Sequence, residues 1–175
     1  MNKLLFATFA FGLFSALSPA QETPKTEISV GYSDMEVLEG YTFRMNGASS
    51  SIAWNVNNWL GVVGDWGVYH ASPGVSLTVN TFTFGPRFSY RHSNRFVPFA
   101  QVLAGGVHAS AVTTGFTDAS KAFAVGAGAG ADVVLDQRGR FALRPQMEYF
   151  GFRGNGVLNS NARLSISLVF RIGAK

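Results

Sequence analysis

The feature that most constrains the fold is the stretch from Arg163 to Ile172, where small or charged side chains alternate with large apolar ones. One face carries hydroxyls, two arginines and Val169, and the other carries Leu164, Ile166, Leu168, Phe170 and Ile172. A period of two predicts a β-strand with one polar and one apolar face. Its ten residues are many for a soluble strand and match the roughly 9–11 that cross a bilayer at a tilt.

Seven earlier segments repeat this alternation, in the ranges 26–33, 47–56, 59–70, 77–91, 96–108, 121–133 and 140–152. The connections are predicted to alternate in length, with short turns between long loops at 34–46, 71–75, 110–120 and 153–161. Short turns on the periplasmic side and longer external loops are the hairpin pattern of outer-membrane barrels. The sequence therefore predicts an all-β fold, an eight-stranded antiparallel up-and-down transmembrane β-barrel with both termini on the periplasmic side.

Side-chain volume decides which face of the strands points into the barrel. The polar faces hold mainly Gly, Ser, Thr, Ala and a few charges, whereas the apolar faces hold large aromatic side chains, among them Trp54, Trp66, Phe82, Phe84, Phe88 and Phe170. The interior of an eight-stranded barrel is only just wide enough to be filled by side chains, so we expect the large set to face lipid. The main alternative is a soluble, lipocalin-like carrier of an apolar ligand. Its exterior would need more charge than the 14% of charged residues in this chain, against about 25% in average soluble proteins.

Two features of the predicted strands stay open. The strand at 96–108 has two partly apolar faces, so its orientation is ambiguous. Pro86, Pro98 and Pro145 fall inside predicted strands, where proline cannot donate a ladder hydrogen bond. We expect bulges or nearby strand ends at these prolines.

The first twenty residues have the pattern of a signal peptide. A short polar region at Asn2-Lys3 precedes an apolar run from Leu4 to Leu17, and Ser18-Pro19-Ala20 supplies small residues for cleavage. The run of fourteen residues falls short of the roughly 20 of a spanning helix, which disfavours a retained anchor. No later run approaches a spanning helix, so any membrane span must come from strands. We expect a signal peptide at 1–20 and one barrel domain at 21–175.

Three short motifs lie in the predicted strands at 59–70, 77–91 and 140–152, and they are Gly64-Asp65, Phe84-Gly85-Pro86-Arg87, and Arg144-Pro145 with Glu148-Tyr149. With the signal peptide and eight amphipathic strands, the chain resembles the small outer-membrane β-barrels of the OmpA-like transmembrane superfamily over essentially its whole mature length. The resemblance implies a monomer in the outer membrane of a diderm bacterium, in contact with outer-membrane lipids and lipopolysaccharide. It also implies periplasmic chaperones and the outer-membrane assembly machinery as partners.

The chain departs from that pattern in two ways. We expect no peptidoglycan-binding domain after the barrel, so the resemblance does not imply a tethering role. The sequence also ends without the terminal aromatic residue that many such proteins offer to the assembly machinery, and we expect Phe170 to serve instead.

Charged side chains gather on the polar faces, where they would share a narrow lumen. They are Asp65, Arg87, Arg91, Asp132, Arg144, Glu148, Arg163 and Arg171, together with Glu27. Charges in such a place are costly unless they are paired and hydrogen-bonded. A proton or ion path, or a gate, is one interpretation, but eight strands leave little room for water, so we favour a structural salt-bridge plug.

Small residues on one predicted strand face long residues on the next. The lumenal face at 121–133 is Ala124, Gly126, Gly128 and Gly130, and the following strand offers Arg144, Gln146 and Glu148. Small beside large is how a narrow barrel interior fills. We expect Arg144 and Glu148 to lie over the glycine row and to meet Arg87 and Asp65 from across the lumen.

His108 and Ser110 are the weak candidates for catalysis. Two residues apart on a strand, they share a face and with a carboxylate could form a nucleophilic triad. The His-x-Ser order resembles that of lipid A deacylase barrels, which share this architecture. The matching acid is not evident, because Asp118 sits in a predicted loop and Glu148 lies further round the barrel. We therefore expect no catalytic residues and no enzymatic activity.

Other chemistry finds little support. The run from Gly126 to Gly130 lacks the strand–turn–helix context of a nucleotide loop, so no cofactor is expected. His70, His92 and His108 are spread over three regions, and there is no cysteine, so no metal site is expected. The basic residues are scattered singly, which argues against nucleic acid. The expected function is a structural or surface role with binding through the external loops.

Overall fold

The computed structural model describes residues 23–38, 43–71, 76–93, 95–113, 116–154 and 157–173. The predicted signal peptide lies outside these ranges. Within them, no helix is long and apolar enough to cross a membrane.

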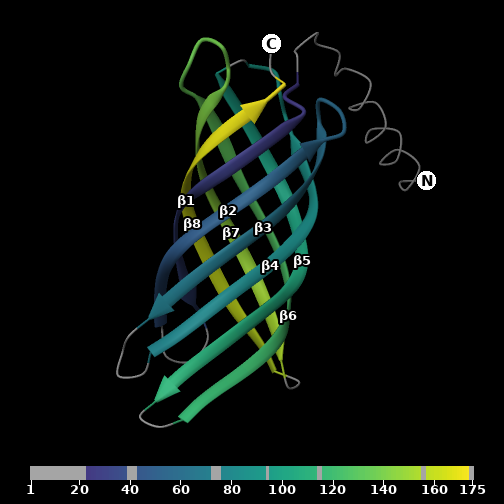
Figure 1. Cartoon of the computed structure of the whole chain (residues 1–175). Helices are drawn as coiled ribbons and strands as arrows, with labels where there is room; N and C mark the ends of the chain where they lie inside the picture. The colour runs from purple at the N-terminus through teal and green to yellow at the C-terminus, as the bar shows by residue number, and fades with distance from the viewer. Residues whose placement is uncertain are drawn as a thin grey trace, which may run out of the picture.

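Eight antiparallel strands follow one another around a closed barrel (Figure 1). They are β1 (Thr26–Val37), β2 (Phe43–Asn55), β3 (Leu60–Ala71), β4 (Ser76–Ser89), β5 (Phe96–Thr113), β6 (Phe116–Val134), β7 (Phe141–Gly154) and β8 (Val157–Ile172). Each strand pairs with its neighbours in the chain, and β1 pairs with β8 to close the ring. The predicted fold class is confirmed. We call the end where β1 begins and β8 ends the terminus end, and the opposite end the hairpin end.

Side chains alternate between the lumen and the outside along each strand. On β8, Leu168 is 52% exposed and its neighbour Ser167 is 4% exposed. Large apolar side chains are exposed on all eight strands, including Trp54, Trp66, Phe82, Phe84, Phe88 and Phe170. A soluble carrier would need the reverse arrangement, so the lipocalin-like alternative is wrong and the outward assignment of the large set is confirmed.

The turns at the terminus end form where the sequence predicts them. The side chain of Asn57 accepts hydrogen bonds from the backbone N–H groups of Trp59 and Leu60, at 3.0 and 2.8 Å. In the β6–β7 turn, the backbone N–H of Phe141 donates to the carboxylate of Asp136 at 2.7 Å and lowers its pKa below the ordinary value. Gly139 takes a φ of +68° there, a region that favours glycine.

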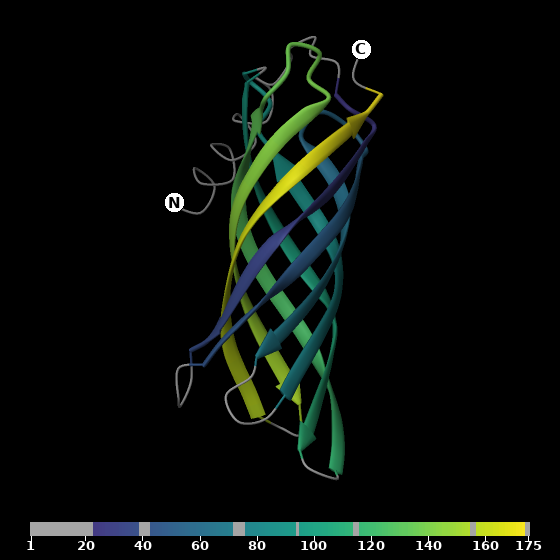
Figure 2. The ribbon, with the colours of Figure 1, turned by 60° about the vertical axis from the view of Figure 1, so that its left-hand side comes forward.

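Of the four loops predicted at the hairpin end, the one at 71–75 is confirmed to within a residue, and the other three are predicted too long. The strands continue through most of them, so β1 and β2 are joined by residues 38–42, β5 and β6 by 114–115, and β7 and β8 by 155–156. In this part of the barrel Glu36 still pairs with Arg44 in the backbone ladder. The hydrogen bonds of a ladder need only backbone groups, whereas the alternation that predicts a strand needs an apolar face. The alternation in the sequence therefore ends before the strand does. The strands therefore project at this end as extended hairpins (Figure 2).

The ambiguous strand β5 turns a large apolar face inward. Phe99, Leu103 and Val107 are buried in the barrel, and Ala100 and Val102 face outward. The argument from side-chain volume assumed that small and polar residues alone fill the interior, and β5 shows that large apolar side chains also lie there.

The prolines are accommodated without bulges. The ladder between β4 and β5 lacks pairs at Gly85 and Pro86, and the ladder between β6 and β7 lacks a pair at Pro145. The register is the same on both sides of each gap, so the expected bulges are absent. Pro98 directly precedes Phe99, the first residue of β5 that pairs with β4, which agrees with a nearby end of that ladder. Because no residue is inserted, every side chain keeps its inward or outward position.

The interior has two layers. The half nearer the hairpin end is apolar, with buried side chains that include Met35, Met45, Tyr69, Val79, Leu103, Val107, Phe150 and Phe152. The remaining length of the lumen carries charged side chains. The candidate site is this charged part of the lumen, between the apolar layer and the terminus end.

Candidate functional site

The charged side chains inside the barrel form one connected network. All of the predicted lumenal residues are inward and at most 8% exposed: Glu27, Asp65, Arg87, Arg91, Asp132, Arg144, Glu148, Arg163 and Arg171. They come from β1, β3, β4, β6, β7 and β8, with Arg91 just beyond the end of β4. The barrel thus brings together residues that are up to 144 positions apart in the sequence.

At the terminus end, Glu27 is the centre of a first cluster. Nη2 of Arg144 lies 2.5 Å from one carboxylate oxygen, and Nη2 of Arg91 lies 2.9 Å from the other. Nη1 of Arg87 is 3.5 Å away. The amide of Asn55 also donates to Glu27, at 3.1 Å. One carboxylate therefore faces three guanidinium groups.

Asp132 is the second carboxylate of this cluster. Arg144 donates hydrogen bonds to it from two nitrogens, Nε at 2.5 Å and Nη2 at 2.8 Å. Nη2 of Arg171 donates to it at 2.8 Å. Paired contacts of this kind are the strongest that an arginine makes. Arg144 therefore ties β7 to both β6 and β1.

Arg163 organises a second cluster in the middle of the lumen. Its Nε donates to Glu148 at 2.6 Å, and its Nη1 donates to Asp65 at 2.7 Å and to the hydroxyl of Tyr69 at 3.0 Å. Gln101 joins the two clusters, since it donates to Glu148 at 2.7 Å and accepts from Nε of Arg87 at 2.8 Å.

Aromatic rings complete the packing of the guanidinium groups. The ring of Phe99 lies 4.6 Å from the guanidinium carbon of Arg87 and 5.1 Å from that of Arg144. Phe150 lies 5.0 Å from that of Arg163. Such cation–π contacts stabilise a desolvated guanidinium.

The predicted partners of Arg144 and Glu148 are wrong. Arg144 binds Asp132 and Glu27, and Glu148 binds Arg163, which also holds Asp65. The reason for the Glu148 pair is strand pairing, because Glu148 and Arg163 are direct register partners on β7 and β8, and Arg163 then joins Glu148 to Asp65 on β3.

The glycine row lies where it was predicted, under long side chains of β7. Gly128 is the register partner of Glu148, and Gly130 that of Gln146. A Cβ atom on Gly130 would lie 2.7 Å from Cβ of Gln146 and 2.7 Å from the ring of Phe99. The prediction that small residues on one strand lie beside long side chains on the next is therefore confirmed for this part of the lumen.

Gln101, Phe99 and Tyr69 are among the residues of the network that escape prediction from the sequence. Two of them lie on β5, whose orientation was ambiguous. Tyr69 lies on β3, where it follows the alternation that places Asp65 inward. The alternation in the sequence therefore already places Tyr69 inward, on the same face of the strand as Asp65 and four residues after it.

The weak catalytic pair is outside the lumen. Nε2 of His108 and the hydroxyl of Ser110 are 3.4 Å apart, a long hydrogen bond, on the outward face of β5. Glu148 points into the lumen and is already paired. Among the described residues no carboxylate accepts a hydrogen bond from His108, and the side chain of Asp118 lies outside them. The described part of the chain also has no group of three His, Asp or Glu that could hold a metal ion.

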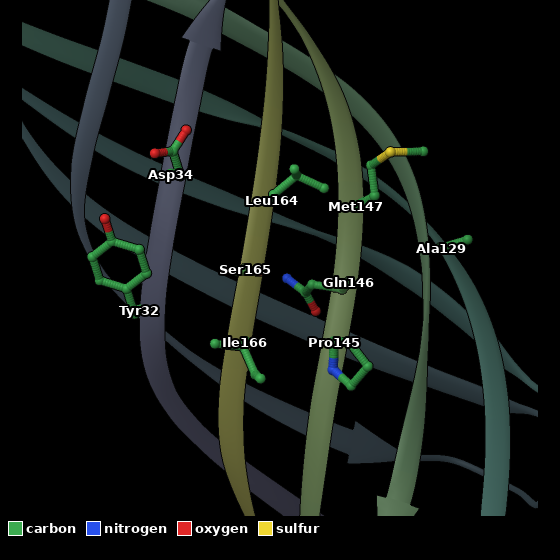
Figure 3. A pocket seen from close by; sticks show the side chains of 9 residues that line it. All are labelled: Tyr32, Asp34, Ala129, Pro145, Gln146, Met147, Leu164, Ser165 and Ile166. Atoms are coloured by element: carbon green, nitrogen blue, oxygen red, sulfur yellow. The ribbon is translucent and has the colours of Figure 1, made fainter.

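A shallow groove of about 470 Å³ crosses the outer wall (Figure 3). Apolar side chains from β1, β6, β7 and β8 line most of it, namely Tyr32, Ala129, Pro145, Met147, Leu164 and Ile166. It lies mainly on the outward apolar face, and Gln146, which also lines it, donates to Glu148 of the charged network at 3.0 Å.

Solved structures of similar fold include outer-membrane barrels. Neisserial surface protein A (NspA) matches with a TM-score of 0.73 at 13% sequence identity, over 85% of this chain and 97% of that one. Ail, the attachment invasion locus protein of Yersinia pestis, matches with 0.59 at 20%, over 84% and 99%. The N-terminal β-barrel domain of Pseudomonas aeruginosa OprF matches with 0.59 at 11%, over 84% and 98%.

No protein-family model matches the chain, and no curated protein matches it in sequence. Identities this low show the fold alone. The chain therefore has the fold of the small eight-stranded outer-membrane β-barrels, as its resemblance implied.

Proposed function

We propose that this chain is a monomeric integral outer-membrane protein, exported through a cleaved signal peptide at residues 1–20, that binds partners at the cell surface through its hairpin end. The apolar side chains of all eight strands would contact lipid, including lipopolysaccharide. Periplasmic chaperones and the assembly machinery would insert it, with Phe170 near the end of β8 as the recognised aromatic residue. The ion-paired lumen would be a structural plug.

One observation carries the surface role. At the hairpin end, β6 pairs with β5 from Phe116 onward but pairs with β7 only from Phe123, so the backbone of 116–122 has a free edge in the described part of the barrel. A free strand edge can accept an extended segment of another protein by main-chain hydrogen bonds. The name of Ail describes attachment and invasion by that protein, which is in keeping with a surface role here.

Two variants test orientation and role. An epitope inserted between residues 114 and 115 should bind antibody on intact cells, whereas one inserted between 137 and 138 should bind only after permeabilisation. Replacing Ala111–Asp118 by Asn-Gly trims the β5–β6 hairpin to the pair of Ser110 and Ala119. The trimmed barrel should still fold, and bacteria that carry it should lose adherence to cultured host cells. Undiminished adherence would contradict the role of the hairpin.

A second candidate function is the binding of a polyanionic glycan. Lys121 pairs with His108 across β6 and β5, and Arg153 lies diagonally across on β7 beside Phe123, so three basic side chains gather on the outer wall. Ail has been solved in complex with the heparin analogue sucrose octasulfate. Titration of this barrel with sucrose octasulfate, with the double variant Lys121→Gln and Arg153→Gln as control, distinguishes this candidate from adherence through the strand edge.

We propose no enzymatic role. The rival reading is a lipid-modifying enzyme of the lipid A deacylase kind, built on His108 and Ser110. Mass spectrometry of lipid A from expressing cells separates the two, since acyl loss that disappears with Ser110→Ala would establish the enzyme.

A further inference from the structure

Exposed basic residues gather on the rim of the barrel at the terminus end. Lys25, Arg95, Arg138 and Arg140 are all exposed there. Within the described residues, Asp136 is the only carboxylate at this end that is not buried, and it accepts a hydrogen bond from the first backbone N–H of β7. None of the four cations forms an ion pair with another described residue. This part of the rim therefore carries a clear excess of positive charge.

The four cations follow one another along one side of the rim, and we call this row the basic arc. The backbone carbonyl of Arg95 accepts from the N–H of Val134, at the start of the β6–β7 turn, at 2.8 Å. The carbonyl of Arg140, at the end of that turn, accepts from the N–H of Arg171 on β8 at 2.8 Å. Lys25 directly precedes β1, which pairs with β8. The β2–β3 turn, on the other side of the ring, carries no charged residue.

Large apolar side chains face outward next to the basic arc. They come from the ends of β5, β7 and β8 and from the β6–β7 turn, and they are Phe96, Leu135, Phe141 and Phe170. The rings of Phe141 and Phe170 lie 5.4 Å apart. Phe96 and Phe141 each directly follow an arginine of the arc in the sequence. Because aromatic girdles mark the two interfaces of a membrane barrel, the arc lies at the depth of the lipid headgroups.

The hairpin end lacks this bias toward one sign of charge. Arg44 pairs there with Asp34 at 3.1 Å and is the register partner of Glu36. Lys121 and Arg153 are the other exposed cations on the described outer wall at that end. Positive and negative side chains are therefore mixed at the hairpin end, whereas the basic arc is almost purely positive.

We infer that the basic arc binds the headgroups of anionic glycerophospholipids, such as phosphatidylglycerol, and prefers them to zwitterionic ones. The acyl chains cover the aromatic side chains of the outer wall, and the phosphodiester meets the arc. Three of the four cations are arginines, whose guanidinium group matches phosphate geometry. Each Lys or Arg near an anionic membrane surface strengthens binding about fivefold. The inference goes beyond the proposed surface role, which concerns the opposite end, and rests on the proposed orientation only for placing these lipids in the periplasmic leaflet.

The test measures which lipid the folded barrel retains. The full chain is refolded in dodecyl maltoside micelles that contain equimolar phosphatidylglycerol and phosphatidylethanolamine, and the lipids that co-purify with it are quantified by mass spectrometry. The wild type should retain phosphatidylglycerol in clear excess. Equal retention of the two lipids overturns the inference. Because both lipids reach both ends of the barrel in a micelle, the result depends neither on the orientation of the barrel in cells nor on adherence.

A triple variant assigns the preference to the arc. Arg95→Gln, Arg138→Gln and Arg140→Gln together remove three exposed charges, so the barrel should still fold and keep its heat-modifiable migration on gels. Its preference for phosphatidylglycerol should fall, by up to about fivefold for each arginine removed. A folded triple variant with the wild-type preference overturns the assignment to the arc.

The matched control removes the same net charge from the hairpin end. Arg44→Gln, Lys121→Gln and Arg153→Gln together should leave the preference for phosphatidylglycerol at the wild-type level. An equal loss in the two triple variants would show that net charge alone attracts the lipid, and would overturn a site at the terminus end.

Discussion

Replacing Gly128 by alanine tests whether β6 is packed tightly against the lumenal side chains of β7. The added Cβ atom would overlap Cγ of Glu148 and would lie 2.6 Å from the carbonyl oxygen of Met147 and 2.9 Å from Cα of Glu148. Two of these three atoms belong to the backbone, so a rotamer change cannot relieve the clash. Overpacking of this kind typically costs about 1–3 kcal/mol.

Gly64→Ala is the matched control. Gly64 lies on the outward face of β3, and a Cβ atom there would meet nothing within 4 Å. A tolerated glycine-to-alanine change stabilises by about 0.4–1 kcal/mol through the unfolded chain. The two variants should therefore differ by about 1.5–4 kcal/mol in the free energy of unfolding. Urea unfolding in lipid vesicles, followed by tryptophan fluorescence, measures the difference, and Gly128→Leu against Ala127→Leu repeats it with a larger side chain. Equal stability within either pair would refute a packed lumen at the glycine row.

Three further outcomes are expected. Leu168→Arg places a cation in the lipid-facing wall and should cost about 2–4 kcal/mol near the bilayer midplane, whereas Ser167→Ala on the lumenal face should cost far less; equal costs on refolding into liposomes would reverse the assignment of faces. Arg163→Met leaves Glu148 and Asp65 buried without a cation, so the free energy of unfolding should fall by about 3–5 kcal/mol, and an unchanged urea midpoint would show that the pair is not desolvated. The barrel should pass no stable single-channel current in planar bilayers, because open aqueous channels belong to barrels of about 16–18 strands; large, steady steps would show an unplugged lumen.

The fold was predictable because a lipid-facing strand must keep one face apolar along its whole span. The sequences of β4 and β8 therefore show directly which face points outward, through the apolar residues between Phe82 and Phe88 and between Leu164 and Ile172. The same signal fails at the hairpin end, where the ladder continues through polar residues such as Glu36 and Arg44. It also fails on β5, whose lumenal face carries Phe99, because an aromatic ring can pack beneath arginines as well as against lipid.

The members of the charged network were predictable, but most of their partners were not. Alternation places Arg144 and Glu148 inward from their own strand alone. Which carboxylate or arginine each one meets depends on the register of neighbouring strands, which puts Arg163 beside Glu148. It depends equally on the closure of the ring, which brings Glu27 of β1 to Arg144. These are long-range properties of the barrel that no local pattern encodes.

Fractionation of the full chain after expression in a diderm bacterium tests the membrane-spanning barrel most directly. The apolar outer wall predicts that the protein sediments with urea-washed outer membranes, and that the folded form migrates differently from the boiled form on gels. Recovery of a folded, detergent-free monomer in the soluble fraction would contradict a lipid-facing wall.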